Sequence, residues 1–109
     1  MNIEDMRFQK SKTIEVLLID WGFSLCAAVN SVDNVDDLSV LRSVITEYSL
    51  LASAYSESTE GFQEDLGVSL GEAAELKLDA ILKNTGSKEW VHYLLDTEEV
   101  LKKLMDAKR

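Results

Sequence analysis

The sequence predicts an all-α protein: a compact bundle of four main helices in a single domain that spans residues 1–109. Apolar residues recur at intervals of three and four along most of the chain, which is the period of an amphipathic helix. Proline is absent, so no residue forces a helix to break. No stretch alternates apolar and polar residues for long enough to form a strand. No repeat or shift in composition marks a second domain.

The first helix is expected from Ser11 or Thr13 to Asn30. One apolar stripe consists of Ile14, Leu17, Leu18, Trp21, Leu25, Ala28 and Val29. A second lies on the opposite side and consists of Val16, Ile19, Phe23 and Cys26. A helix that is apolar on two faces must be covered on both. It is therefore either the central helix of the bundle or part of a homodimer interface. Gly22, in mid-helix, either permits close approach of another helix or is simply tolerated.

The second helix is expected to begin after residues 31–34 and to fade near Ser56. Asp33 or Asn34 can cap it. Acidic residues in its first turn stabilise the helix, because they lie near the positive end of its dipole. Its inner stripe consists of Leu38, Leu41, Ile45, Tyr48, Ala52 and Tyr55.

A possible short extra helix lies near residues 58–67, although two glycines in this stretch weaken it. The third main helix is expected to begin at Ser69, because Ser69 and Glu72 have the spacing of a capping box. It should stop at residues 84–86, where Gly86 supplies a left-handed residue.

The fourth helix is expected from Ser87 to the end of the chain. Residues 96–99 could instead start a separate helix, because their sequence, Asp-Thr-Glu-Glu, resembles a helix beginning. The apolar stripe keeps its phase through this point, which favours one helix.

The charge of the chain is concentrated in its middle. The formal net charge is −9. Residues 33–79 contain eleven acidic and two basic residues, which accounts for all of it. This balance argues against direct binding to nucleic acid or to an anionic membrane, since both require a basic surface. It favours a basic protein as partner.

No targeting or membrane segment is predicted. The longest apolar run, from Ile14 to Val29, has about 16 residues and includes Glu15 and Asp20, whereas a spanning helix needs about 20 mainly apolar residues. We expect a soluble, cytoplasmic protein. The lone cysteine, Cys26, excludes an internal disulfide and suits a reducing compartment.

The motifs that could carry catalysis are weak, and the protein is predicted not to be an enzyme and to need no cofactor or metal. Glu89 and His92 have the Glu-x-x-His spacing of di-metal bundles, but the chain has one histidine and cannot complete such a site alone. Residues 67–71 read Gly-Val-Ser-Leu-Gly, the pattern of a nucleophile elbow, but that motif needs a preceding strand. Cys26 lies on an apolar helix face, which indicates a buried, unreactive thiol.

The predicted partner-binding residues combine acids with aromatic anchors. Aromatic side chains ringed by charge are common at the centres of protein interfaces. The predicted residues are Tyr55, Glu57, Glu60, Phe62, Glu64 and Asp65. The sequence thus predicts an acidic protein-binding module, most concretely an inhibitor or immunity protein that masks a basic protein such as a nuclease toxin. The alternative is a homodimeric regulatory or adaptor protein that uses the two-faced first helix as its interface.

Overall fold

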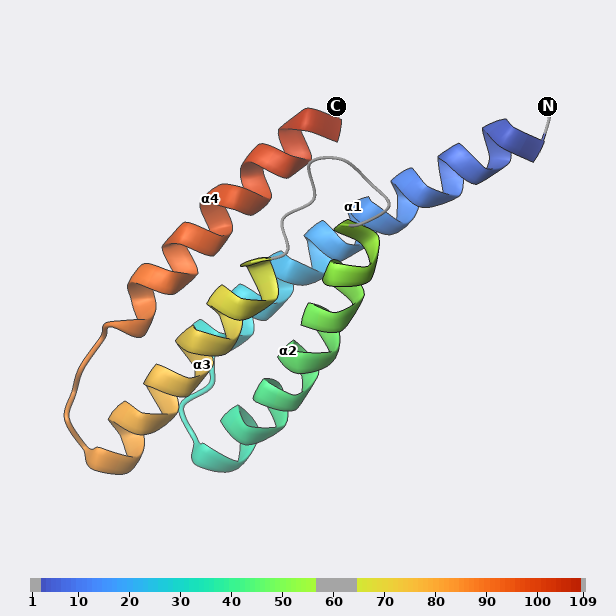
Figure 1. The fold of residues 1–109 in the computed structure, drawn as a ribbon. Coiled ribbons are helices and arrows are strands. Elements are labelled where there is room, and N and C mark those ends of the chain that lie inside the picture. The colour runs from blue at the N-terminus through green and yellow to red at the C-terminus, as the bar shows by residue number, and fades with distance from the viewer. Residues whose placement is uncertain (1–2, 57–64, 109) are drawn as a thin grey trace.

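The fold is a bundle of four antiparallel helices in a computed structural model that describes the backbone of residues 3–56 and 65–108 and the side chains of 14–54 and 68–106. The helices are α1 (Ile3–Ser31), α2 (Val35–Ser56), α3 (Asp65–Lys83) and α4 (Trp90–Lys108). Around the bundle, α2 packs on α3, α3 on α4 and α4 on α1 (Figure 1). No strand occurs in the described backbone. The predicted all-α bundle of four helices is confirmed.

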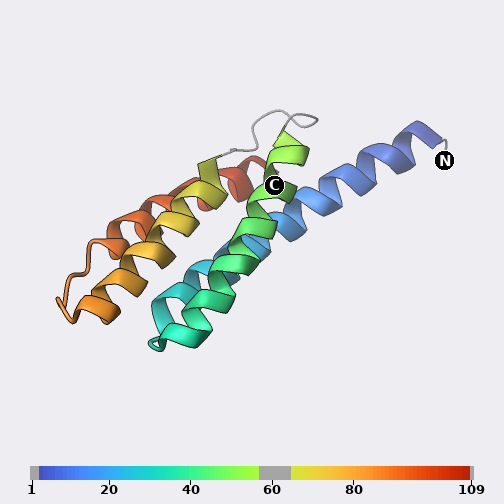
Figure 2. The ribbon, with the colours of Figure 1, turned by 60° about the horizontal axis from the view of Figure 1, so that its bottom comes forward.

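Helix α1 is longer than predicted and extends past the other three. It begins at Ile3, because residues 3–10 contain neither glycine nor proline and nothing there stops a helix. Figures 1 and 2 show this N-terminal part projecting beyond the bundle. Ser11 and Thr13, which were predicted as starting points, therefore lie within the helix.

Both apolar stripes of α1 contribute buried side chains to the core of a single chain, while Leu17 of the first stripe stays exposed. Leu25 and Val29 are buried on one face, and Ile19 and Cys26 on the other. The helix contacts α2, α3 and α4. Helix α3 likewise contacts the three other helices, so α1 has no special central position, and both of its apolar stripes contribute to the core of one chain. A homodimer through this helix stays a prediction.

Gly22 marks the closest approach between α1 and its neighbours. A Cβ atom there would lie 2.8 Å from Cδ2 of Leu101 in α4 and 2.8 Å from the hydroxyl of Tyr48 in α2. Tyr48 is fully buried and donates a 2.9 Å hydrogen bond to the Leu18 carbonyl. Its ring meets Trp21 edge to face, with centroids 5.1 Å apart. The glycine is therefore needed for close packing.

Asn34 caps α2. Its side-chain oxygen accepts a 2.8 Å hydrogen bond from the Asp37 amide, and its side-chain nitrogen donates to the Asp37 carboxylate at 2.6 Å. This reciprocal pair satisfies one of the free amides at the helix start. Asp33, the other possible cap, pairs instead with Lys77.

Helix α3 begins earlier than the capping box predicted. It starts at Asp65, so Ser69 lies inside the helix and the predicted start at Ser69 is wrong. Burial of Leu70, Ala73 and Ala74 on one face outweighs the cost of glycines in the first turns. Of the possible extra helix near 58–67, residues 65–67 belong to α3 and residues 58–64 lie outside the described part of the chain.

The end of α3 is set by Asn84 rather than by Gly86. Asn84 has a φ of 52°, and the amides of Asn84 and Thr85 donate to the carbonyls of Ile81 and Ala80. This is the Schellman arrangement, in which a left-handed residue lets the chain satisfy the last carbonyls. Gly86 is also left-handed, with a φ of 69°, but it lies in the following loop.

Helix α4 is one continuous helix from Trp90, three residues later than predicted. Ser87 lies before the helix, and its hydroxyl accepts from the Glu89 amide at 3.5 Å. Residues 96–99 do not start a separate helix. The buried Thr97 hydroxyl donates to the Tyr93 carbonyl at 2.7 Å, so it is satisfied within the helix.

One segment, Ile14–Ser31 of α1, is long and apolar enough to span a membrane by length and composition alone. The core helix of a soluble protein passes the same test, and this segment contributes buried side chains to the bundle core. The expected cytoplasmic location stays a prediction.

Replacing Gly22 with alanine should destabilise the fold by about 1–2 kcal/mol, because overpacking against Leu101 and Tyr48 exceeds the gain in helix propensity. Gly71→Ala is the matched control. A Cβ atom at Gly71 meets only Ile45, at 3.9 Å, so that variant should gain up to about 1 kcal/mol. Urea unfolding of both variants measures the difference. A stabilised Gly22→Ala would contradict the packing described here.

Candidate functional site

The predicted partner-binding residues cluster at the connection between α2 and α3. Tyr55 lies in the last turn of α2 and Asp65 is the first residue of α3, and their side chains are outside the described set. The other four residues lie outside the described part of the chain altogether: Glu57, Glu60, Phe62 and Glu64. Because α2 and α3 are antiparallel neighbours, Tyr55 and Asp65 occupy the same end of the bundle (Figure 1). Their role in binding stays a prediction.

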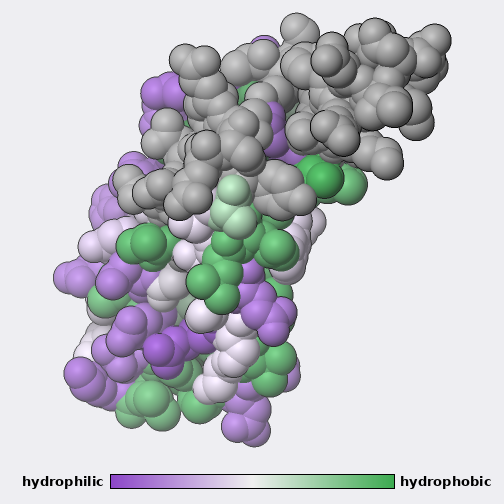
Figure 3. Space-filling view, turned by 45° about the vertical axis from the view of Figure 1, so that its right-hand side comes forward, coloured by the Kyte–Doolittle hydropathy of each residue, from purple (hydrophilic) through white to green (hydrophobic). Residues whose placement is uncertain are grey.

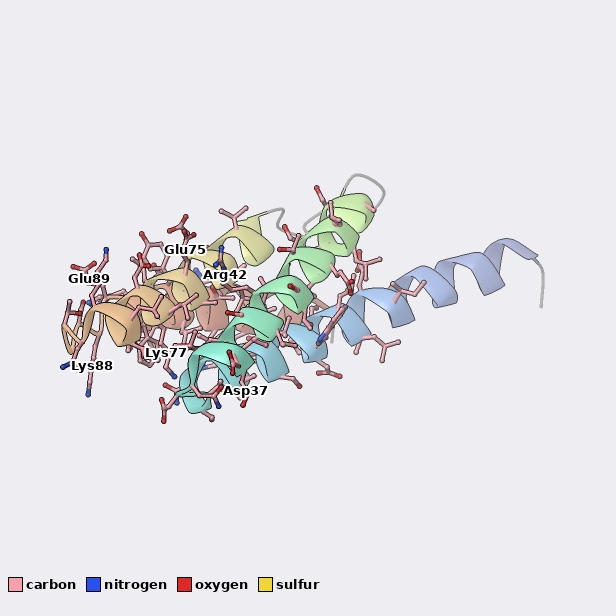
Figure 4. The ribbon with its side chains drawn as sticks, turned by 90° about the horizontal axis from the view of Figure 1, so that it is seen from below. Asp37, Arg42, Glu75, Lys77, Lys88 and Glu89 are labelled. Carbon is pink, nitrogen blue, oxygen red and sulfur yellow. The ribbon has the colours of Figure 1, made fainter. Side chains whose placement is uncertain are left out.

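The described parts of α2 and α3 carry an acidic surface. Its carboxylates are all exposed: Asp36, Asp37, Glu47, Glu72, Glu75 and Asp79. Residues 33–79 include two bases, Arg42 and Lys77. Arg42 is exposed, whereas Lys77 is buried. Figure 4 shows Arg42 on the flank of α2 nearer Glu75, with Asp37 on the other flank. Because Lys77 pairs with Asp33, the remaining charge of residues 33–79 comes from ten acidic residues and the exposed Arg42.

Lys77 closes the C-terminal end of α1 from inside the bundle. Its ammonium group donates to the carbonyl oxygens of Val29 at 2.7 Å and Asn30 at 3.0 Å, and lies 3.2 Å from an Asp33 carboxylate oxygen. It also lies 4.6 Å from the centre of the Trp90 ring. The last turn of α1 has no basic residue of its own. Lys77 supplies the positive charge that this end of the helix dipole favours.

These contacts leave Lys77 with no free donor for a ligand. An ammonium group has three donors, and three oxygens of the chain take them. Lys77 lines a cavity of about 310 Å³ at this end of the bundle, together with Asn84, Lys88 and Trp90. Its charge is committed to the fold, so the cavity is not an anion site built on this lysine.

Sequence reasoning missed the role of Lys77, although a signal was present. Lys77 falls on the apolar stripe of α3, between Ala73 and Ile81. A lone base on an inward stripe indicates a buried cation that must find acceptors within the fold. The sequence could not say which acceptors, because Val29 and Asn30 are 48 and 47 positions away along the chain.

A second surface, which we call the α1–α2 face, is apolar. Leu17, Val40 and Leu51 remain 61%, 64% and 43% exposed. Trp21 and Val44 are half-buried and pack on the core. Figure 3 shows hydrophobic residues reaching the surface among hydrophilic ones on the side that carries α2. Exposed apolar side chains also occur on α3 and α4, but those of this face adjoin a half-buried tryptophan, an arrangement typical of interaction surfaces.

Another hollow lies between α1 and α4. It has a volume of about 420 Å³ and is lined by Asp20, Phe23, Lys102, Met105 and Asp106. Phe23 is half-buried and packs against the core. A charged residue at Phe23 would therefore perturb folding as well as any dimer, and Leu17 is the cleaner position for testing self-association.

The residues considered for catalysis do not come together. Glu89 and His92 are both exposed, and no group of three metal-ligating side chains occurs among the described residues. Residues 67–71 lie within α3, so Ser69 is part of a helix and follows no strand in the described backbone. The nucleophile-elbow geometry is therefore absent there.

Cys26 is buried and protonated. Burial, and secondarily the negative charge of Glu98, raise the pKa of the thiol to about 12. The thiolate is the reactive form of cysteine, so this side chain is inert at neutral pH, as the sequence indicated. Burial also raises the pKa of the Tyr48 hydroxyl, with a smaller contribution from Cys26.

Removing the Lys77 charge should destabilise the bundle far more than removing that of its partner. Lys77→Met leaves the helix-end carbonyls without their donor, for an expected loss of about 2–3 kcal/mol. Asp33 is 87% exposed, so Asp33→Asn should cost less than about 1 kcal/mol. Thermal or urea unfolding measures both. Equal losses would show that the ion pair, and not the capping of α1, is what matters.

Alkaline pH should destabilise the protein through Cys26. The unfolded thiol loses its proton near pH 9, whereas the folded thiol keeps it to about pH 12. The stability that it contributes is therefore complete below pH 9 and is lost between these values, at a slope of up to about 1.4 kcal/mol per pH unit. Urea midpoints from pH 8 to 11 should fall less steeply for Cys26→Ala than for the natural chain. Parallel curves would contradict this assignment.

Three comparisons with known proteins give no relative. No family model matches the chain, no curated protein matches it in sequence, and no solved structure matches its fold.

Proposed function

We propose that this protein is a non-catalytic, acidic protein-binding module that masks a basic protein. The concrete form is an inhibitor or immunity protein that neutralises a cationic nuclease or toxin. The observation that carries the proposal is the charge of α2 and α3. Six exposed carboxylates face solvent there, Lys77 is buried, and Arg42 is the one exposed base of residues 33–79.

Electrostatics supports a role in masking a cationic partner. A surface of one sign raises the association rate with a partner of the opposite sign and makes the rate fall with salt. A nuclease binds phosphates through a basic cleft, and a row of carboxylates can occupy that cleft in their place.

The connection between α2 and α3 is the proposed centre of this contact. Glu57, Glu60, Glu64 and Asp65 would supply the charge, and Tyr55 and Phe62 would supply aromatic anchors. In the sequence these residues stand between the described parts of the two helices that carry the acidic surface.

The homodimeric regulator remains a second candidate function, and one observation favours it. Leu17 is 61% exposed on α1, the helix that this alternative would use as its interface. In that case the acidic surface would serve solubility alone.

Identification of the partner comes first. Tagged protein is incubated with an extract of its native cells and washed at low and then at high salt, and the retained proteins are identified by mass spectrometry. A basic protein that is held at low salt and released at high salt agrees with the proposal. Recovery of the protein itself alone would favour the homodimer.

Reversing the charge of Glu60 and Glu64 to lysine should lower the association rate with that basic protein by about tenfold at low ionic strength. The matched control is Glu89→Lys with Asp96→Lys. It changes the net charge of the protein by the same amount, at two exposed positions just before and within α4. Stopped-flow or surface-plasmon measurements give both rates. An equal decrease in the two variants would indicate a general charge effect and contradict the assignment of the site.

A further inference from the structure

We propose that the α1–α2 face docks an amphipathic helix whose apolar side is bordered by lysine or arginine. The inference deepens the proposed function, on which it rests, by naming the surface and the chemistry of the partner segment that it takes. The face consists of Leu17, Trp21, Val40, Val44 and Leu51.

The residues of the face lie along adjoining flanks of two helices, with Leu17 and Leu51 at one end and Val40 at the other. Trp21 and Tyr48 are in ring contact, which places these positions of α1 and α2 at the same level. The helices are antiparallel, so Leu17, one turn before Trp21, lies opposite Leu51, about one turn after Tyr48. Positions 40, 44 and 51 share one flank of α2, because steps of four and seven residues return to nearly the same angle.

The face has the graded exposure of a binding surface. Trp21 and Val44 form a half-buried floor that is packed against the core. Leu17, Val40 and Leu51 stand around it with roughly half or more of their surface open to solvent. A tryptophan held rigidly at the centre of an apolar patch is a typical energetic anchor of an interface. Steps of three and four residues on an incoming helix would match this spacing.

The border of the face is acidic. Exposed carboxylates of Asp37 and Glu47 lie on α2. Helix α2 contains one base, Arg42, and it lies on the flank of α2 that is nearer Glu75. The face therefore complements an apolar helix with basic edges.

The same border argues against the other occupants. A second copy of the chain would bring its own acidic border against this one, and like charges across an interface cost free energy. An anionic membrane surface would be repelled in the same way. A cationic amphipathic helix gains from both the apolar floor and the acidic border.

The test uses the full-length protein and a fluorescein-labelled synthetic helix of 18 leucine and lysine residues, with leucines on one side. We expect saturable binding by fluorescence anisotropy, weakened by salt. Amide chemical-shift changes in ¹H–¹⁵N NMR spectra should be centred on Leu17, Trp21, Val44 and Leu51. A peptide in which serines replace the leucines keeps the charge and should bind at least tenfold more weakly.

Leu17→Ser with Leu51→Ser should weaken binding of the leucine–lysine helix about tenfold. The matched control is Leu82→Ser with Leu95→Ser, two exposed leucines of α3 and α4, 62% and 57% open to solvent. The control pair should change the affinity for the leucine–lysine helix by less than about twofold. Since all four leucines are exposed, circular dichroism should show both variants folded.

Three results would overturn the inference. They are equal binding of the two peptides, equal effects of the two leucine pairs, and concentration-dependent self-association that Leu17→Ser abolishes. Binding of the basic protein recovered from the native cells distinguishes failure of this inference from failure of the proposed function. If its binding falls with Glu60→Lys and Glu64→Lys but not with Leu17→Ser and Leu51→Ser, the inference fails and the proposed function stands.

Discussion

The close approach at Gly22 fixes how α1 crosses the bundle. No side chain separates α1 from Leu101 of α4 or from the hydroxyl of Tyr48, so both neighbours reach the helix at the same level. Tyr48 can then donate a hydrogen bond to the Leu18 carbonyl and meet the Trp21 ring edge to face. These contacts set the register between α1 and α2. The α1–α2 face depends on that register. The contact between Trp21 and Tyr48 is what brings Leu17 and Leu51 to the same level of the bundle.

Lys77 joins three helices at the other end of the bundle and pairs with an exposed acid there. It joins α3 to the last carbonyls of α1 and to the Trp90 ring of α4. A cation that is buried in this way needs a full set of acceptors, and the end of a helix provides carbonyls that would otherwise lack donors. The ion pair of Lys77 with Asp33 neutralises one acid of residues 33–79, so the other ten acids and Arg42 make up the negative charge of that region.

The parts of the fold that depend on periodicity could be predicted from the sequence, and those that depend on distant contacts could not. The four helices and most of their buried residues follow from apolar spacing. The start of α3 was predicted wrongly, because Ser69 and Glu72 form a local capping pattern, whereas burial of Leu70, Ala73 and Ala74 decides the helix. The α1–α2 face was not predicted at all. Leu17 falls on a predicted apolar stripe of the first helix, and only the packed bundle shows that Leu17 and Leu51 both remain exposed.

The acidic border and the apolar face belong together physically. An exposed cluster that includes Leu17, Val40 and Leu51 would favour self-association in a protein of low net charge. With a formal charge of −9 concentrated around α2 and α3, two copies repel each other before their apolar faces meet. In the proposed docking, a partner with basic residues would meet the opposite field, so charge would select the partner and the apolar floor would contribute the affinity. The acids would then discriminate between partners of the face by their charge. This accounts for an open apolar surface and a strongly acidic composition in the same small bundle.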